Sequence, residues 1–458
     1  MATPDKTTAI SGFLSGVYFF GRENMNFLTD NIKSLYLKFL LASMASALVM
    51  SIYSFVDAIA VGQSEGPIGA AAMAVINPIY EIIVFLGILC GVGGSVLMSI
   101  AKGEGSEEKG NTYFSASILL MTVLTAILWS AFALFSEEIF TFLGADKTTL
   151  PKVMEYAVWL IRFFPVFIAP TFIGSFVRND GAPGLTMAAV IIGGCVNIFG
   201  DWFFVFPLGM GMKGAALATV TGTSLQVLIM CSHFVSSKCG LKLVAPFQLG
   251  RAIRNILSIG FGASVLNLGT VILVIILNNQ IIKYGGNNAL SVYGVVGTIA
   301  SLFQALYCGV GQAIQPLVSS NFGAGKKERV QTLFLFSLVT VIGLGIIFTA
   351  IGELFPLAII KLFISATPEV IAIAPTIIRK YFTVFLFMGI TVLSTYYLQS
   401  IMKSKMSMVI AALRSLIIGE LLLFVLPLFF GLNGVLLALP VSELIVTVIA
   451  LTYIKKSA

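Results

Sequence analysis

A few ionisable side chains lie within long apolar segments of this sequence, and they are the first candidates for chemistry. Charged groups are costly inside a bilayer, so those found there usually serve a function or pair with one another. In the apolar segments these residues are Asp57, Glu81, Arg162, Asp201, Arg414, Glu420 and Glu443.

The clearest chemical grouping joins Asp57, Asn197 and Asp201. Asn197 and Asp201 are four residues apart, so on one helix they share a face. If Asp57 faces them, two carboxylates and an amide oxygen share a small cavity. Crowded carboxylates favour binding of a proton, and oxygen ligands also suit a hard cation such as Na⁺. The grouping therefore indicates a site for H⁺ or Na⁺, unless both carboxylates lie hydrated at the outer ends of their helices.

The other polar residues could line a substrate cavity or serve packing. Glu81 could contact a substrate or pair with a neighbouring helix. Arg414 and Glu420 could form an ion pair, or Arg414 could extend toward the cytoplasm. Glu443 could line a cavity or be structural. Gln304 could line a passage or hold helices together, and the second use of a membrane amide is the commoner one.

Composition places these residues in a membrane protein. Hydrophobic residues make up 58% of the 458 residues and charged residues 10%, against roughly 45–50% and 25% in soluble proteins. The net charge of +7 does not indicate a nucleic-acid partner, because the basic residues lie in short loops between apolar runs. The five cysteines show no Cys-x-x-Cys spacing, so neither a disulfide framework nor a zinc site is predicted.

Nothing in the sequence indicates an enzyme or an ATP-driven pump. No phosphate-binding loop of the type Gly-x-x-x-x-Gly-Lys-Ser/Thr is present. The only histidine, His233, falls near the cytoplasmic end of an expected span. We expect no cofactor and no resident metal ion.

A hydrocarbon core needs about 20 apolar residues per helix, and the apolar runs predict twelve transmembrane helices in two bundles of six. Residues 1–37 form a cytoplasmic or interfacial leader, 38–236 the N-terminal lobe, 237–254 a cytoplasmic linker and 255–458 the C-terminal lobe. The expected spans lie near 38–62, 70–100, 112–136, 153–177, 184–207, 214–236, 255–282, 289–320, 331–356, 371–398, 406–429 and 434–454.

The two lobes repeat one another in sequence. The pattern that begins at Pro207-Leu208 and continues through Gly211 and Gly214 recurs from Pro427-Leu428, 220 residues later. An even number of spans per half makes the repeats parallel, and the interface between such repeats is where secondary transporters bind their cargo. Most of the 27 basic residues then fall on one side, which predicts that both termini are cytoplasmic.

Several motifs together resemble the multidrug and toxic compound extrusion (MATE) family, in its MepA-like branch. The resemblance covers nearly everything after residue 38. It is carried by Val177-Arg178-Asn179-Asp180-Gly181, Val196-Asn197-Ile198-Phe199-Gly200-Asp201, Phe206-Pro207-Leu208-Gly209-Met210-Gly211, Gly311-Gln312-Ala313-Ile314-Gln315-Pro316, Asn321-Phe322-Gly323-Ala324-Gly325 and Leu426-Pro427-Leu428-Phe429-Phe430-Gly431-Leu432.

This resemblance implies a secondary active antiporter that exports organic cations in exchange for H⁺ or Na⁺ by alternating access. It also implies a coupling-ion site at Asp57, Asn197, Asp201 and Thr219 in the N-terminal lobe. The sequence departs from a sister branch, which has acids on the seventh and tenth helices, so no coupling site is expected in the C-terminal lobe. The first span also lacks a proline that is often found there.

An alternative is a flippase for lipid-linked precursors on a related fold, which would need basic residues along its cavity; only Arg162 and Arg414 lie within spans. The expected setting is the membrane of a bacterial or archaeal cell. We expect a monomer in a lipid bilayer with small organic cations as substrates and no nucleic-acid partner.

Overall fold

The structure, a computed structural model, describes residues 25–246, 248–363 and 368–457; most of them are helical, and no strand occurs among them. The helices run in chain order as α2 (Ile32–Gly103), α3 (Glu107–Leu134), α4 (Ser136–Phe142), α5 (Leu150–Arg162), α6 (Phe164–Asn179), α7 (Pro183–Gly200), the π-helix η1 (Asp201–Val205), α8 (Gly211–Cys231), the 3₁₀-helix η2 (Ser232–Val235), α9 (Leu249–Gly323), α10 (Lys327–Leu354), α11 (Pro356–Phe363), α12 (Pro368–Phe382), α13 (Phe385–Ser400), α14 (Ser404–Ala412), the π-helix η3 (Leu413–Ile417), α15 (Ile418–Phe430) and α16 (Leu432–Ser457). Some side chains of α2, α9 and α11 are not described.

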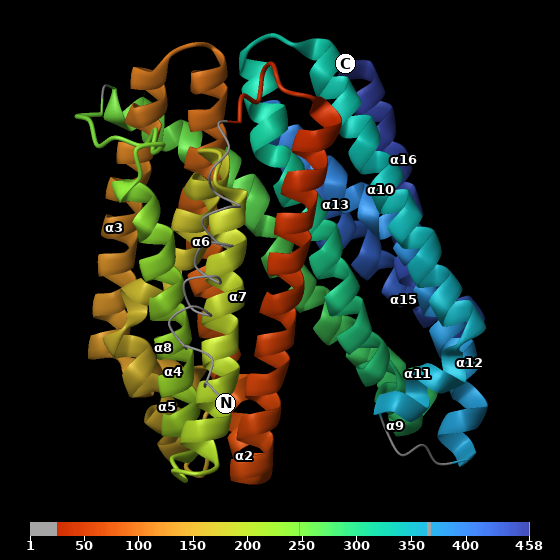
Figure 1. The fold of residues 1–458 in the computed structure, drawn as a ribbon. Coiled ribbons are helices and arrows are strands. Elements are labelled where there is room, and N and C mark those ends of the chain that lie inside the picture. Colours follow the sequence, from red (N-terminus) through yellow and green to blue (C-terminus); the bar gives the residue numbers. More distant parts are fainter. Residues whose placement is uncertain (1–24, 247, 364–367, 458) are drawn as a thin grey trace, which may run out of the picture. The chain divides into compact units, whose positions relative to one another are not determined.

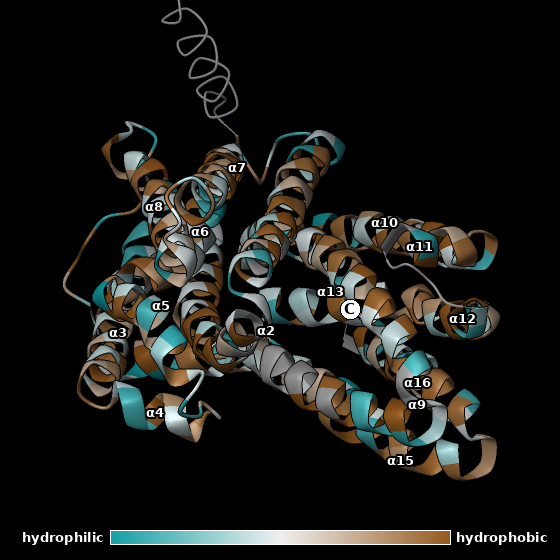
Figure 2. Cartoon of the chain, turned by 90° about the horizontal axis from the view of Figure 1, so that it is seen from below, coloured by the Kyte–Doolittle hydropathy of each residue, from teal (hydrophilic) through white to brown (hydrophobic). Residues whose placement is uncertain are grey.

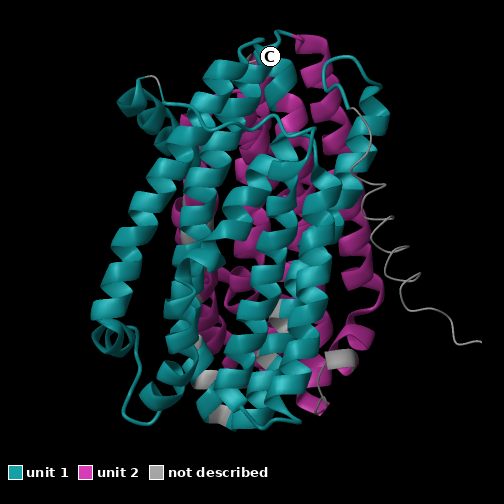
Figure 3. Ribbon diagram, turned by 60° about the vertical axis from the view of Figure 1, so that its left-hand side comes forward, with its two compact units in different colours: residues 1–260, 319–325 teal, residues 261–318, 326–458 magenta. Residues whose placement is uncertain are grey.

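The chain divides into two compact units (Figure 3). Unit 1 comprises residues 1–260 and 319–325, and unit 2 comprises residues 261–318 and 326–458. In unit 1, α2 packs along α3, α6 and α7 (Figure 1). In unit 2, α13 packs against α10 and α16.

Helix α2 begins earlier than the apolar pattern predicts. The first span was expected from residue 38, but α2 starts at Ile32 because the Asn31 side chain caps it. Asn31 Oδ1 accepts hydrogen bonds from the backbone N–H groups of Lys33 (3.0 Å) and Ser34 (3.3 Å). A cap of this kind satisfies donors that no earlier turn can reach. Residues 1–24 of the expected leader lie outside the described part of the chain.

The repeat seen in the sequence recurs in the backbone. Gly66 interrupts α2 with φ 63° and Gly286 interrupts α9 with φ 72°, and these positions are 220 residues apart. Positive φ also recurs at the same spacing in Gly105 and Gly325, and in Gly211 and Gly431. Residues that have a Cβ atom rarely adopt positive φ, whereas glycine does so readily. The two halves therefore turn at equivalent places, which supports the predicted duplication.

The prediction of an all-helical membrane protein is confirmed. Among the described residues, ten helices are long and apolar enough to cross a membrane, or eleven if the bent pair α5 and α6 forms one span. The span expected at 255–282 falls on the part of α9 where several side chains are not described.

Large apolar side chains are exposed on several helices. In Figure 2, brown, the colour of hydrophobic residues, recurs along the cartoon of α3, α10 and α15. Exposed examples are Leu119, Val123 and Ile127 on α3, Leu335, Val339 and Ile346 on α10, and Leu421, Phe424 and Leu428 on α15. Continuous apolar surface of this extent is costly in water. These faces suit contact with lipid.

Glycines allow α7 and α8 to pack backbone against backbone in unit 1. A Cβ atom at Gly222 would lie 2.6 Å from the carbonyl oxygen of Gly193 and 2.8 Å from Cβ of Asn197. These distances are too short for a real side chain. Small residues at such crossings let membrane helices approach closely, and here the approach fixes the position of Asn197.

We therefore expect Gly222→Ala to lower the thermal stability of the detergent-purified protein. Overpacking of a tight crossing costs about 1–3 kcal/mol, and the mutant should unfold at a lower temperature in a fluorescence-monitored melt. The matched control is Gly343→Ala, because a Cβ at Gly343 meets nothing within 4 Å. Equal melting temperatures for the two variants would contradict the packing argument.

Candidate functional site

Helix α2 places Asp57 against α7 in unit 1. The side chains of Val49 and Tyr53 contact Gly194, where an added Cβ would lie 2.9 Å from Val49 Cγ1 and 3.3 Å from Tyr53 Cδ1. Asp57 follows Tyr53 by one helical turn, so it lies on the same face of α2. Asp57 is buried, with 9% of its surface exposed.

Helix α8 adds Thr219 to the same region. Thr219 Oγ1 accepts a hydrogen bond from Asn197 Nδ2 (3.3 Å) and donates one to the carbonyl oxygen of Ala215 (2.9 Å). The amide nitrogen of Asn197 is thereby occupied. Thr219 thus orients Asn197 so that its oxygen remains available.

After Gly200, the last residue of α7, the helix continues as a wider π turn. Asp201 is the first residue of η1, which directly continues α7, and it is fully buried. Single π turns within α-helices occur frequently at functional sites. The sequence predicted a regular helix here and missed the wide turn.

The structure brings Asp57, Asn197, Asp201 and Thr219 together in unit 1. Asp57 and Asp201 are near enough for each to act on the other's charge. Among the described residues, no hydrogen-bond donor reaches Asp57 Oδ1, Asn197 Oδ1 or either carboxylate oxygen of Asp201. We call these four residues the acid cluster.

Buried acceptors without donors define what the acid cluster can bind. Leaving a charged oxygen buried and unpaired costs several kcal/mol. Two unit charges about 4 Å apart also repel by about 4 kcal/mol at an effective dielectric constant of about 20. A bound proton or a hard cation removes both penalties. The arrangement is suited to binding a cation through oxygen ligands.

Two tyrosines that the sequence analysis missed lie beside the acid cluster. The hydroxyl groups of Tyr80 and Tyr156 are 2.7 Å apart, and Tyr156 donates to Thr219 Oγ1 at 3.4 Å. The charge of Asp57 acts on both tyrosines. No sequence spacing relates these residues, because they come from α2 and α5.

The residues expected to line a substrate cavity do not all lie in one pocket. Glu81 is exposed on α2 and belongs to unit 1. Gln304 and Glu443 line a pocket of about 650 Å³ within unit 2. Glu420 is also in unit 2 but does not line that pocket, and its Oε1 is buried without a partner among the described residues.

Arg414 lies in the same pocket and pairs with Glu443 rather than with Glu420. Arg414 Nε donates to Glu443 Oε1, and both side chains are buried. Thr391 Oγ1 donates to Glu443 Oε2 at 2.6 Å. The ion pair with Glu420, one of the two possibilities that the sequence left open for Arg414, is not found, because α16 supplies the acid that Arg414 meets.

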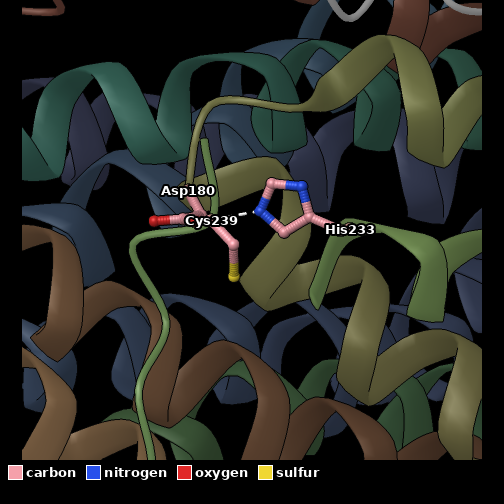
Figure 4. A group of neighbouring side chains, drawn as sticks. All are labelled: Asp180, His233 and Cys239. Carbon is pink, nitrogen blue, oxygen red and sulfur yellow. Dashed lines mark hydrogen bonds and ion pairs between the residues drawn. The ribbon is translucent and has the colours of Figure 1, made fainter. Parts of the chain in front are cut away.

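A second polar group holds the segment after α8 in unit 1. Asp180 Oδ2 lies 2.8 Å from His233 Nε2 (Figure 4). Asp180 Oδ1 pairs with Lys102 Nζ at 2.6 Å, and Oδ2 also accepts a hydrogen bond from the Gly240 N–H at 2.8 Å. Burial raises the pKa of Asp180, but the His233 hydrogen bond and the Lys102 charge outweigh it, so this pKa lies below its ordinary value.

The same group offers ligand atoms for a metal ion. Asp180, His233 and Cys239 each present one within 4.8 Å of the others. Both Asp180 oxygens are already hydrogen-bonded and the Lys102 charge lies beside them. The arrangement is satisfied without an ion, and its role is to fasten the segment that contains Gly240.

Comparison with known proteins identifies the family of the chain. The sequence profile of the MatE family matches residues 42–203 and 263–425, which is more than half of the chain. The chain therefore belongs to the MATE family of multidrug efflux transporters. The predicted resemblance is confirmed.

Within this family the chain is MepA-like. It is 25% identical over 420 residues to the multidrug export protein MepA of Staphylococcus haemolyticus, covering 90% of this chain and 91% of that protein. It is 26% identical over 413 residues to MepA of Staphylococcus aureus strain MSSA476, covering 88% and 89%. A multi-pass membrane transporter of small molecules is thus the confirmed class.

Solved structures show the same fold. An outward-facing multidrug resistance MATE family transporter of the MOP superfamily matches with a TM-score of 0.86 and 20% identity, over 93% of this chain and 96% of that one. A MOP superfamily transporter from Pyrococcus furiosus matches with the same score, identity and coverage.

We expect Asp180→Asn to loosen the segment that follows α8. The mutation removes the charge that attracts Lys102, and charge-assisted hydrogen bonds are about twice as strong as neutral ones. Limited trypsin digestion should cleave after the exposed Lys238 about fivefold faster or more. Because the pKa of Asp180 is lowered, its stabilising contribution is present at neutral pH and is lost only as pH falls below about 3.9.

The control for this experiment is Glu108→Gln, which removes an exposed carboxylate in the first turn of α3. Its digestion should match that of the unmodified protein. An Asp180→Asn protein that resists trypsin equally well would show that the polar group does not fasten this segment.

Proposed function

We propose that the protein is a secondary active antiporter that exports organic cations in exchange for H⁺ or Na⁺. The acid cluster of unit 1 is its coupling-ion site. One observation supports this assignment above all others: four buried oxygen atoms from Asp57, Asn197 and Asp201 have no donor among the described residues. Binding of a cation lowers the free energy of such a site, and departure of the cation without a replacement raises it again.

Each residue of the acid cluster has a distinct role in binding the coupling ion. Asp57 and Asp201 supply the negative charge that holds the proton or sodium ion. Asn197 adds a neutral oxygen. Thr219 positions Asn197 by accepting a hydrogen bond from its amide nitrogen, while the Thr219 hydroxyl donates to the carbonyl oxygen of Ala215. Tyr80 and Tyr156 lie beside the cluster, where their hydroxyl groups bond to each other and Tyr156 donates to Thr219.

Alternating access couples the two cations. When the acid cluster is open to the outside, it takes up H⁺ or Na⁺, and the organic cation is released. When it opens to the cytoplasm, the coupling ion leaves, and the uncovered negative charge attracts the next organic cation. Acids in a low-dielectric site attract cations far more strongly than in water.

We also propose the arrangement of the chain in the membrane. Twelve spans form two bundles of six, 38–236 and 255–458, joined by a cytoplasmic linker at 237–254, with both termini cytoplasmic. The equivalent glycine turns at Gly66 and Gly286 support a second span pair in α9 that matches the pair in α2. The working unit is a monomer that requires no nucleic acid and no cofactor.

A lipid-precursor flippase is not favoured. Relatives that are similar in sequence along most of the chain are named multidrug export proteins. Of the two arginines found in the spans, Arg414 is neutralised by Glu443, and Arg162 lies over the Trp159 ring at 5.5 Å.

The decisive variant is Asp57→Asn, which removes one charge of the acid cluster but keeps the side-chain shape. Reconstituted in liposomes, the unmodified protein should accumulate a fluorescent organic cation when a pH or a sodium gradient is imposed. The variant should fold normally, as judged by size-exclusion chromatography, and its uptake should fall to the level of protein-free liposomes.

Asp146→Asn provides the matched control, because Asp146 is exposed in a loop and its carboxylate accepts hydrogen bonds from its loop neighbours Thr148 and Thr149. Its uptake should equal that of the unmodified protein. Gradient-driven uptake that persists in Asp57→Asn would rule out the acid cluster as the coupling site. Uptake that neither gradient drives in the unmodified protein would rule out antiport.

A further inference from the structure

Large aliphatic side chains are exposed in the segment that follows α8 in unit 1. Val235 is 88% exposed and Leu243 is 73% exposed, and the neighbouring Lys242 side chain is exposed as well. Exposed apolar groups of this size are costly in water. The boundary between lipid headgroups and acyl chains, in contrast, accepts apolar and basic side chains together. The composition of this segment therefore suits a membrane interface.

The segment is held in place by its backbone, so its exposed side chains have fixed positions. Asn111 Oδ1 accepts a hydrogen bond from the Lys242 N–H at 3.0 Å, and Ser115 Oγ accepts one from the Val244 N–H at 2.9 Å. Leu241 is buried and packs in one apolar cluster with side chains of α3 and α6. These contacts turn Leu241 inward and leave Lys242 at the surface.

The segment lies against the beginning of α3, where the apolar face of that helix starts; it is the green stretch beside the upper end of α3 in Figure 1. Leu119 follows Ser115 by one helical turn and Val123 follows by two, and both are exposed. One turn rises about 5.4 Å along the helix. The surface that suits lipid therefore continues from α3 onto the segment that contains Leu243.

Exposed basic side chains gather around the same end of α3. They are Lys109, Lys242, Arg251 and Arg254. The charge of Arg251, near the start of α9, acts on Lys109. The acids of this region are Glu104, Glu107 and Glu108.

These acids do not neutralise the basic group. Glu104 pairs with Lys109 at 2.7 Å. The other two acids lie in the first turn of α3, where the helix N-terminus favours negative charge. Among the residues that the structure describes, no acid forms an ion pair with Lys242, Arg251 or Arg254. Their charge is available to anionic groups outside the protein.

We propose that this region binds the headgroups of anionic phospholipids in the cytoplasmic leaflet. Its residues, which we call the headgroup surface, are Val235, Lys242, Leu243, Arg251 and Arg254. The basic side chains attract the charged headgroups, and the two aliphatic side chains enter the boundary with the acyl chains. A free phosphate ion would use only the basic side chains. The inference goes beyond the proposed antiport and takes from it only the side of the membrane.

The test measures lipid binding to the purified full-length protein in detergent by native mass spectrometry. Phosphatidylglycerol is compared with phosphatidylcholine that has the same acyl chains, so only the headgroup charge differs. The unmodified protein should bind phosphatidylglycerol about tenfold more tightly or better, because each basic side chain near an anionic lipid strengthens the attraction about fivefold. Glycerol phosphate, which has no acyl chains, should not displace the lipid.

The informative variant is Lys242→Gln/Arg254→Gln, which removes two exposed charges and leaves the backbone hydrogen bonds of the segment possible. The preference for phosphatidylglycerol should fall to about threefold or less. The matched control is Lys147→Gln/Lys361→Gln, which removes two exposed lysines that are expected on the other side of the membrane and should keep the full preference.

A second variant, Val235→Ser/Leu243→Ser, tests the apolar part of the headgroup surface. It should weaken binding of both lipids by about the same factor, about threefold or more, and leave the ratio of the two affinities unchanged. Unaltered affinities in this variant would contradict the insertion of the two side chains into the lipid boundary.

Equal affinity for the two lipids in the unmodified protein would overturn the proposal, and so would a full preference that survives in Lys242→Gln/Arg254→Gln. Displacement by glycerol phosphate would overturn it too, because the ligand would then be a free anion. No ion gradient is present in this assay, and Asp57→Asn should keep the lipid preference. Failure of the proposed antiport is thus distinguishable from failure of lipid binding.

Discussion

The structure depends on one constraint: carboxylates are buried in unit 1 where the protein supplies them with no donor. Asp201 is fully buried and neither of its oxygens has a partner among the described residues. Folding alone gives no reason to keep such a residue, because an apolar side chain there would avoid the cost of desolvation. The close helix crossings at Gly194 and Gly222 fix α2, α7 and α8 around the buried carboxylates, so the helices cannot easily move apart to let water reach them. A bound cation is what balances this arrangement.

The two units differ in how their buried charged side chains are paired. In unit 1 the acids Asp57 and Asp201 lie close together, and no basic residue among those described pairs with either. In unit 2 the acid Glu443 is neutralised by Arg414 and Thr391. Each unit also places a charged residue in a π turn, Asp201 in η1 and Arg414 in η3. Duplication therefore preserved the backbone turns, whereas the charges diverged: unit 1 has two neighbouring acids, and unit 2 has an acid paired with an arginine.

The sequence predicted much of the fold and the centre of the candidate site. Hydropathy indicates helices that cross a membrane, and the spacing of Asn197 and Asp201 on one helix needs no tertiary information. The partners across helices were less predictable. Tyr80 and Tyr156 meet only because α2 and α5 pack together. The sequence raised Glu420 only as one possible partner of Arg414 and did not indicate Glu443 on α16, which the structure places there. The start of α2 was missed because a polar cap at Asn31 determines it, which hydropathy does not register.

The central claim is that Asp57 and Asp201 together hold the coupling cation. The most direct test is an infrared difference spectrum of the carboxyl stretch, recorded on the purified protein before and after addition of sodium or of an organic cation. The unmodified protein should show a change in carboxyl absorption as the bound proton or ion is displaced, and the double variant Asp57→Asn/Asp201→Asn should not. A carboxyl signal of the same size in the double variant would contradict the account.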